Sequence, residues 1–201
     1  MQLELAALPP LERYKLLIGL VIPRPIAWIS TRSANGVANC APFSFFNVFS
    51  EDPPLCVIGI NPRSDGRLKH TLKNIRRTGE FVVNLADEAT ANAMHISSYE
   101  FTEEESEFEK TGLTPVPATL VGHPRIAEAA ASLECKVFRR IEVGATRELV
   151  LGEILLAHAR EGIIDPQTKR VSEEHYRPIG RLFANRYCTT RQRFDLPGKL
   201  P

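Results

Sequence analysis

Residues 27–50 read AWISTRSANGVANCAPFSFFNVFS, and this stretch decides the expected fold. Two runs rich in β-branched, aromatic and apolar residues, 27–32 and 38–50, lie on either side of Asn35-Gly36. Asn-Gly is a strong hairpin signal, because both residues tolerate a positive φ. The stretch therefore predicts a β-hairpin that opens the core of the protein.

The segments that follow continue the pattern of short strands and short helices. Residues 54–61 and 80–85 are rich in strand-forming residues. Between them, residues 71–77 are predicted to form a short helix bounded by Gly66 and Gly79. A second helix is expected within residues 87–98.

The second half of the chain predicts further strands. Residues 134–143 alternate polar and apolar side chains, which predicts a half-buried antiparallel strand with Cys135, Val137, Ile141 and Val143 on its apolar face. Residues 148–160 fit a helix by propensity, and a strand with a bulge at Gly152 fits at least as well. A last segment spans residues 176–190. With no repeat or linker, many antiparallel strands predict a mainly β single domain closed into a barrel.

Composition excludes several classes of protein. The 201 residues are 43% hydrophobic and 24% charged, which is typical of a globular protein with one substantial core. No apolar run is long enough to span a membrane, and no basic, apolar leader begins the chain, where Pro9-Pro10 is expected to interrupt any helix. A cytoplasmic location is therefore expected. The net charge of +1 favours neither a nucleic acid nor a membrane partner.

Motifs for several kinds of chemistry are missing. The chain has no dinucleotide-binding, P-loop, zincin or nucleophile-elbow signature. The five histidines show no metal-ligand spacing with each other or with the cysteines. Neither a metal site nor a catalytic side chain is predicted. The four cysteines are expected to be reduced and mostly buried, at Cys40, Cys56, Cys135 and Cys188.

Three local features remain, each with two interpretations. The basic run from Arg63 to Arg77 contains one acid, Asp65, and meets a helix start near Thr71, which suits a phosphate-sized anion. On composition alone, a solvated helix face is favoured. The aromatic run 41–47 suits either the face of a planar ring or the core, and core is favoured. The acidic segment 101–110 is expected to be a solvated helix or loop.

Taken together, the basic and aromatic runs belong to a set of blocks that resembles the flavin reductase-like, FMN-binding split-barrel family. The similarity is to the branch of flavoredoxin and of the small components of two-component monooxygenases. It covers residues 14–190, within one domain of residues 1–201. The blocks occur in family order: GLVIPRPIAWIST (19–31), NCAPFSFFN (39–47), DPP (52–54), KHTLKNI (69–75), TGEFVVNL (78–85) and YRPIGRL (176–182).

The resemblance implies a six-stranded antiparallel split barrel, Greek-key-like, with a few short helices. It also implies a homodimer that binds one FMN per subunit near the dimer interface. Ser30 and Thr31, together with Lys69 and Thr71, are expected to hold the FMN phosphate, and Arg24 the phosphate or the ribityl chain.

The same resemblance places the flavin ring. The isoalloxazine is expected to lie along the run Ala41, Pro42, Phe43, Ser44, Phe45, Phe46 and Asn47. Ser44 and Asn47 are the polar members of this run, and Ser50 is a further candidate. In the carboxy-terminal block, Tyr176, Arg177 and Tyr187 are expected to cover the flavin from one subunit or the other.

The activity that the resemblance implies is hydride transfer from NADH or NADPH to flavin N5. Reduced FMN then either leaves to supply a partner monooxygenase or stays bound and passes electrons to another acceptor. The two cofactors carry the chemistry, so no acid or base need stand out in the sequence. One alternative is an FMN carrier or sensor without reductase activity. Another is an anion- or nucleic-acid-binding module that uses the run from Arg63 to Arg77.

Two positions depart from the family pattern. His70 stands where an aspartate is common in the Lys-Asp-Thr motif, which places an imidazole beside the expected phosphate site. Phe183 and Ala184 replace the two glycines of a Leu-Gly-Gly-Asn ending, and Phe183 is expected to narrow the place where a nicotinamide would stack.

Overall fold

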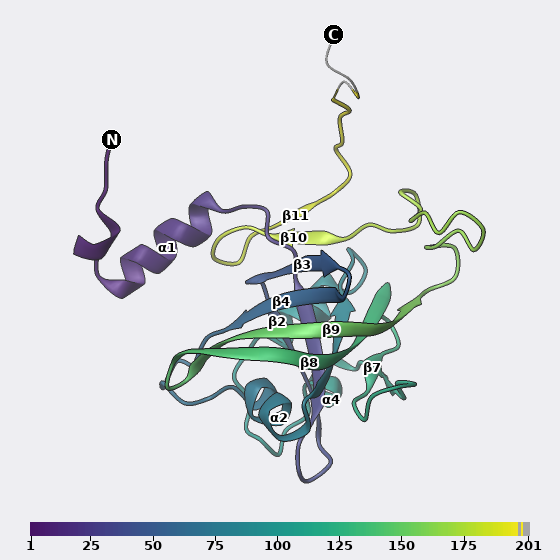
Figure 1. Ribbon diagram of the computed structural model, residues 1–201, viewed down its shortest axis with the longest axis horizontal. Helices are drawn as coiled ribbons and strands as arrows, with labels where there is room; N and C mark the ends of the chain where they lie inside the picture. The colour runs from purple at the N-terminus through teal and green to yellow at the C-terminus, as the bar shows by residue number, and fades with distance from the viewer. Residues whose placement is uncertain (197, 199–201) are drawn as a thin grey trace.

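The protein is built on a seven-stranded antiparallel sheet in the order β2-β1-β5-β8-β9-β4-β3, seen in a computed structural model that describes residues 1–196 and 198 (Figure 1). The main-sheet strands are β1 (Ala27–Arg32), β2 (Ala38–Phe43), β3 (Phe46–Glu51), β4 (Pro54–Ile60), β5 (Glu80–Leu85), β8 (Ala131–Gly144) and β9 (Arg147–Ala159). Two small sheets pair β6 (Pro115–Val116) with β7 (Arg125–Ile126), and β10 (Ile179–Arg181) with β11 (Tyr187–Thr189). The mainly β fold class is confirmed, with seven strands in this sheet rather than six.

The extra strand arises within the stretch that decides the fold. The hairpin at Asn35-Gly36 is confirmed, with Gly36 at a φ of 83° and Ala27 opposite Phe43. The run expected as one strand over residues 38–50 breaks after Phe43 into β2 and β3. β2 and β3 are the two edge strands of the sheet, so the short link between them brings the two edges together and closes the curved sheet into a barrel. The N–H of Gly59 on β4 donates to the carbonyl of Phe45 in this link, at 2.7 Å.

The long β8–β9 hairpin differs from the expected alternation. Of the two interpretations of residues 148–160, the strand is confirmed as β9, but the bulge expected at Gly152 is not there, since Gly152 pairs with Cys56 and Val137. Residues 134–143 do not keep one apolar face buried. Ile141 and Val143 are 45% and 65% exposed, whereas Glu134 is fully buried. The reason is that Phe138 is an extra residue on β8, between the pairs Val137–Gly152 and Arg139–Leu151, and a shift by one residue exchanges the two faces of the strand beyond it.

Glu134 is buried because it holds a neighbouring loop. Its carboxylate accepts hydrogen bonds from the backbone N–H groups of Thr119, Leu120 and Val121, at 2.5–3.2 Å. The ring nitrogen Nε2 of His158 lies 2.5 Å from the same carboxylate. A charge removed from water needs such partners, and these explain how a glutamate occupies a core position.

Five helical segments complete the fold: η1 (Leu5–Ala7), α1 (Pro10–Leu20), α2 (His70–Thr78), α3 (Ala91–Ile96) and α4 (Glu107–Thr111). The expected helix at residues 71–77 is confirmed as α2, which ends at Gly79 with a φ of 69°. The helix expected within residues 87–98 is the shorter α3. No helix among the described residues is long and apolar enough to cross a membrane.

The expected interruption of any amino-terminal helix at Pro9-Pro10 is confirmed, since η1 ends at Ala7 and α1 begins only at Pro10. Proline is tolerated in the first turn of a helix, where its missing N–H has no intrahelical partner to lose. Apart from Ile18, the residues of α1 are not buried, and Figure 1 shows α1 standing away from the main sheet.

Two apolar clusters fill the interior. One lies inside the curved sheet and includes Ile29, Ile58 and Phe81. The other packs Trp28 of β1 against Met94 and Phe108 from α3 and α4. Cys40, Cys56 and Cys135 are buried, Cys188 is half-buried, and all four are free thiols, as expected.

Candidate functional site

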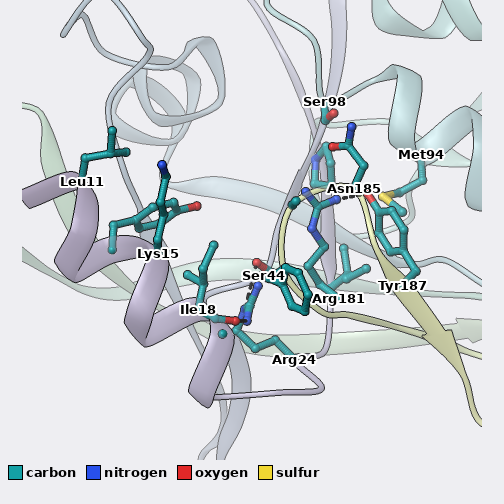
Figure 2. Close-up of a pocket in the computed structure, with 16 residues that line it drawn as sticks. Leu11, Lys15, Ile18, Arg24, Ser44, Met94, Ser98, Arg181, Asn185 and Tyr187 are labelled. Atoms are coloured by element: carbon teal, nitrogen blue, oxygen red, sulfur yellow. Dashed lines mark hydrogen bonds between the residues drawn. The ribbon is translucent and has the colours of Figure 1, made fainter.

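Two adjoining cavities open beside β2, and both are lined by Pro42 and Ser98. The larger has a volume of about 740 Å³. In Figure 2, α1 forms one wall with Leu11, Lys15 and Ile18, and the opposite wall carries Arg181, Asn185 and Tyr187 from the carboxy-terminal hairpin. The smaller has a volume of about 40 Å³ and lies at the start of α2. We call them the ring compartment and the basic compartment.

The basic compartment takes its charge from two side chains of the basic run. Arg63 and Lys69 line it, together with His70 and Thr71. The buried Nε of Arg63 has no hydrogen-bond partner among the described residues. No hydrogen bond or ion pair to another described side chain holds the Lys69 ammonium either. At the start of α2 the first backbone N–H groups have no intrahelical partner, and no side chain caps them. These donors together suit an anion.

The rest of the basic run is already paired. Arg67 pairs with Asp65, Lys73 with Glu103 and Arg76 with Glu148. Arg77 donates to the carbonyl of Arg32 at 2.7 Å. The run is therefore neither a uniformly solvated helix face nor a free basic stripe for a nucleic acid.

Burial lowers the pKa values of two groups in the basic compartment. Burial lowers the pKa of Lys69. The charge of Arg63 lowers this pKa further, whereas the charge of Glu100 raises it. Burial also lowers the pKa of His70, and the nearby Arg63 lowers it further. Nη1 of Arg63 lies 3.1 Å from His70 Nε2, which fits a neutral imidazole that accepts the bond. The imidazole at position 70 thus adds no negative charge, and Arg63 is ion-paired with Asp65 and Glu100, each at 3.9 Å.

Two carboxylates, Glu107 and Glu100, also border this compartment, and Glu100 is ion-paired with Arg63 at 3.9 Å. Glu107 lies in the acidic segment expected to be solvated, but it is only 4% exposed. It accepts hydrogen bonds from Asn39 Nδ2 and the N–H of Cys40. Burial raises the pKa of Glu107 above its usual range. Glu100 binds Ser64 through both the N–H and the hydroxyl of that residue.

Three of the four residues expected at the phosphate have hydroxyls that are already used. Ser30 is fully buried, donates to the carbonyl of Pro124 at 2.5 Å and accepts from Asn84 Nδ2. The hydroxyls of Thr31 and Thr71 both donate to Oδ1 of Asn39. Ser30 and Thr31 therefore lie behind the site and not in it, and only the backbone N–H of Thr71 remains available.

Arg24 lines the ring compartment, but its guanidinium holds the fold together. It is 6% exposed and donates to the carbonyls of Ile18, Val21 and Leu182 at 2.6–2.8 Å. Its Nε donates to the Ser44 hydroxyl at 3.3 Å. These bonds tie the end of α1 to the carboxy-terminal hairpin, so the expected contact of Arg24 with phosphate or ribityl is not supported.

The run expected to face the flavin ring divides at the break between β2 and β3. Pro42 and Ser44 line the ring compartment, and Ala41, Pro42 and Phe43 line the basic compartment. The remaining members of the run line neither, namely Phe45, Phe46, Asn47 and Ser50. Phe46 packs against the core, and Oδ1 of the exposed Asn47 accepts the N–H of Val48.

In the carboxy-terminal block the structure replaces two expected residues with others. Tyr176 and Arg177 line neither compartment, and Arg177 borders a separate surface hollow with Glu173 and Arg191. The hairpin brings Arg181, Asn185 and Tyr187 to the ring compartment instead. Tyr187 was expected there, whereas Arg181 and Asn185 were missed. Arg181 and Asn185 each lie two residues from Phe183 in the sequence, and this proximity is the signal that could have identified them. Phe183 itself lines the ring compartment and is 42% exposed.

These residues fit FMN as the resemblance implies it. Arg63, Lys69 and the start of α2 supply donors for a phosphate. The ring compartment combines apolar walls with polar groups from Ser44, Arg181 and Tyr187, as planar ligands require. Because the two compartments meet at Pro42 and Ser98, one ligand with a phosphate at one end and a ring at the other can occupy both.

Comparison with known proteins gives one matching family. The sequence model for the Flavin reductase like domain matches residues 19–180. The chain is similar to a solved structure of 2-nitrobenzoate 2-nitroreductase from Pseudomonas fluorescens, with 37% identity, a TM-score of 0.91, and coverage of 100% of this chain and 98% of the other.

Two further solved structures are similar. Nitrilotriacetate monooxygenase component B from Bacillus cereus is 30% identical, with a TM-score of 0.91 and coverage of 98% of both chains. A split-barrel flavin reductase domain from Shewanella frigidimarina is 24% identical, with a TM-score of 0.80 and coverage of 97% of this chain and 96% of the other, and it shows the shared fold.

Proposed function

The chain belongs to the flavin reductase-like domain family, and from this premise we propose that it binds FMN and reduces it with NADH or NADPH. The observation that carries the proposal is the pair of adjoining compartments, one basic and one lined by apolar and polar groups. When bound, FMN supplies the capacity to take up two electrons from a nicotinamide.

The residues of this chain contribute binding and orientation. Lys69, Arg63 and the free N–H groups of α2 hold the phosphate. Pro42 and Ser44 form the β2 side of the ring compartment, with Tyr187 on the opposite wall, and Ala41 and Phe43 line the basic compartment. The deep burial of Thr31, Asn39 and Thr71 fixes the start of α2 against β1 and β2, so the phosphate donors are preorganised.

We further propose that electrons leave toward a partner monooxygenase or a small-molecule acceptor. The similarity to a monooxygenase component and to a nitroreductase supports the two routes, respectively. A homodimer belongs to the same proposal. Its support is the row of exposed apolar side chains on α1, at Leu11, Tyr14, Leu17 and Leu20.

An FMN carrier or sensor without reductase activity is the second candidate. It is favoured by Phe183, which occupies the wall of the ring compartment and carries the guanidinium of Arg186 over its ring at 5.3 Å. A bulky side chain at this place reduces the room for a nicotinamide on the flavin.

The visible spectrum of the purified protein, supplemented with FMN, tests both candidates. Under anaerobic conditions, addition of NADH or NADPH is expected to bleach the flavin band faster than it bleaches free FMN. A bound flavin that neither nucleotide reduces above the free-flavin background supports the carrier. Absence of any FMN binding contradicts both.

A further inference from the structure

The ring compartment is positively charged, which flavin binding by itself does not require. Its lining includes three cations, Lys15, Arg24 and Arg181. Among the described residues that line it, none is an aspartate or a glutamate. Burial lowers the pKa of Arg24, and the nearby Arg181 lowers it further, so the two guanidinium groups lie close enough to repel each other.

The two arginines differ in how much of their hydrogen-bonding capacity remains. The guanidinium of Arg24 donates hydrogen bonds to three backbone carbonyls and to the Ser44 hydroxyl. Arg181 donates one side-chain hydrogen bond, to the Tyr187 hydroxyl. Its remaining guanidinium N–H groups have no partner among the described residues. A guanidinium offers five donors in a planar fork that matches a carboxylate, so Arg181 is a free anion-binding group on the cavity wall.

Neighbouring side chains hold this free group in place. The Arg181 guanidinium lies over the Tyr187 ring, 4.6 Å from its centroid. Tyr187 is in turn fixed by His95, whose Nδ1 lies 3.0 Å from the Tyr187 hydroxyl. Figure 2 shows Arg181, Asn185 and Tyr187 grouped on the wall that faces α1. The fork is therefore oriented before a ligand arrives, which lowers the entropy cost of binding.

The rest of the wall is apolar and suits a flat hydrocarbon group. Ile18, Met94 and Phe183 line it, and Leu11 and Tyr14 extend it along α1. The volume of about 740 Å³ lies in the upper part of the usual range for ligand pockets. With the phosphate of FMN in the basic compartment, as proposed above, the flavin ring would lie in the ring compartment and form part of the surface offered to a second small molecule.

We propose that the second molecule is a small aromatic carboxylate, whose carboxylate binds Arg181 and whose ring lies among the apolar residues. This inference rests on the proposed function, since the flavin ring forms part of the site. Lys15, exposed on the facing helix, adds positive charge without a fixed contact.

The test uses wild-type protein loaded with FMN, and FMN affinity is measured first. Benzoate and its neutral analogue benzamide are then titrated, with the flavin absorbance band and calorimetry as readouts. Benzoate is expected to bind at least about tenfold more tightly, because a charge-assisted pair with Arg181 is available to it alone. Inorganic phosphate at matched ionic strength is expected not to displace benzoate.

Two variants test whether Arg181 is the residue that binds the carboxylate of benzoate. Arg181→Gln is expected to weaken benzoate binding about tenfold or more and to leave benzamide unchanged. Arg186→Gln is the matched control, since Arg186 lies on the same hairpin outside the cavity lining. It is expected to change neither affinity.

The outcomes separate the two proposals. If FMN binds and benzoate is no tighter than benzamide, the aromatic carboxylate is excluded while the flavin site stands. Displacement by phosphate at similar concentrations identifies a site for the phosphate of a nucleotide, which also overturns the proposal. If wild-type protein does not bind FMN, both proposals fail. The wild-type comparison decides the matter even if Arg181→Gln does not fold.

Discussion

Lys69 is the residue whose side chain is both close to the start of α2 and free of other partners among the described residues. Replacement by glutamine in Lys69→Gln is expected to weaken FMN binding about 10- to 100-fold, because charge-assisted hydrogen bonds contribute roughly 1.5–3 kcal/mol. Riboflavin, which lacks the phosphate, is expected to lose little affinity. Fluorescence titration of both flavins measures the difference.

The matched control for this variant is Lys73→Gln on the same helix. Lys73 is exposed and pairs with Glu103 at 2.9 Å. It is expected to leave both affinities unchanged. Equal losses of FMN and riboflavin in Lys69→Gln would remove Lys69 from the phosphate site.

His123 gives a pH dependence of stability with a defined sign. It is 3% exposed, its Nδ1 accepts the N–H of Arg32 at 3.0 Å, and its Nε2 lies 2.9 Å from the Thr78 hydroxyl. Burial lowers the pKa of His123. The charges of Arg77 and Arg32 lower this pKa further, whereas Glu80 raises it. The folded state therefore binds fewer protons than the unfolded chain.

The stabilisation from neutral His123 is complete above the unfolded pKa of about 6.5 and is lost as pH falls through the lowered folded value. Urea unfolding at pH 7.5 and 5.5 is expected to show a smaller pH-dependent loss of stability in His123→Gln than in wild type. His175→Gln, at an exposed histidine, is the control. An unchanged pH dependence in His123→Gln would contradict a buried neutral imidazole.

At the scale of elements, Gly152 allows β9 to pack over the core. A Cβ at this position would lie 2.4 Å from Cζ of Phe81 and 3.3 Å from Sγ of Cys56. Phe81 is fully buried in the core. Gly152→Ala is therefore expected to lower the free energy of unfolding by about 1–3 kcal/mol through overpacking. Chemical denaturation measures it.

Gly144, in the same hairpin, supplies the control. A Cβ there meets nothing within 4 Å. Gly144→Ala is expected to change stability by less than about 0.5 kcal/mol. Equal stability of the two variants would show that Phe81 repacks without cost.

Local patterns explain which elements were predictable from sequence. The β1–β2 hairpin follows from Asn35-Gly36, and α2 follows from its bounding glycines, because both signals act over a few residues. The buried faces of β8 were not predictable, since its register shifts depend on pairing with β9 and on the loop that Glu134 holds. Residues 134–143 do alternate polar and apolar side chains in the sequence, but the extra residue Phe138 turns the apolar side chains that follow it to the other face of β8.

The same distinction holds for the site. Lys69 and residues 41–44 lie beside the cavities, because the strand and the helix start that carry them are local features of the sequence. Ser30 and Thr31 line neither compartment, because the hydroxyls of a buried strand bond to distant partners such as Pro124 and Asn39, which local sequence does not show. Arg181 was missed because the hairpin that aims it at α1 has no turn signal as strong as Asn-Gly.

At the scale of the whole molecule, α1 leaves apolar side chains uncovered. We expect the double variant Leu17→Lys with Leu20→Lys to shift a homodimer toward monomer, because two charges would be buried in the interface. Wild-type protein is expected to sediment as a dimer. Glu12→Lys, which changes a polar residue of the same helix, is expected to leave the dimer intact. A monomeric wild type would contradict the proposed assembly.

Much of the wall of the ring compartment comes from α1 and the β10–β11 hairpin, which lie outside the main sheet and are joined through Arg24. Substitutions on exposed positions of such segments usually change stability little. Changes in α1 and the β10–β11 hairpin can therefore alter the wall of the ring compartment during evolution, while the barrel and the proposed phosphate donors stay as they are.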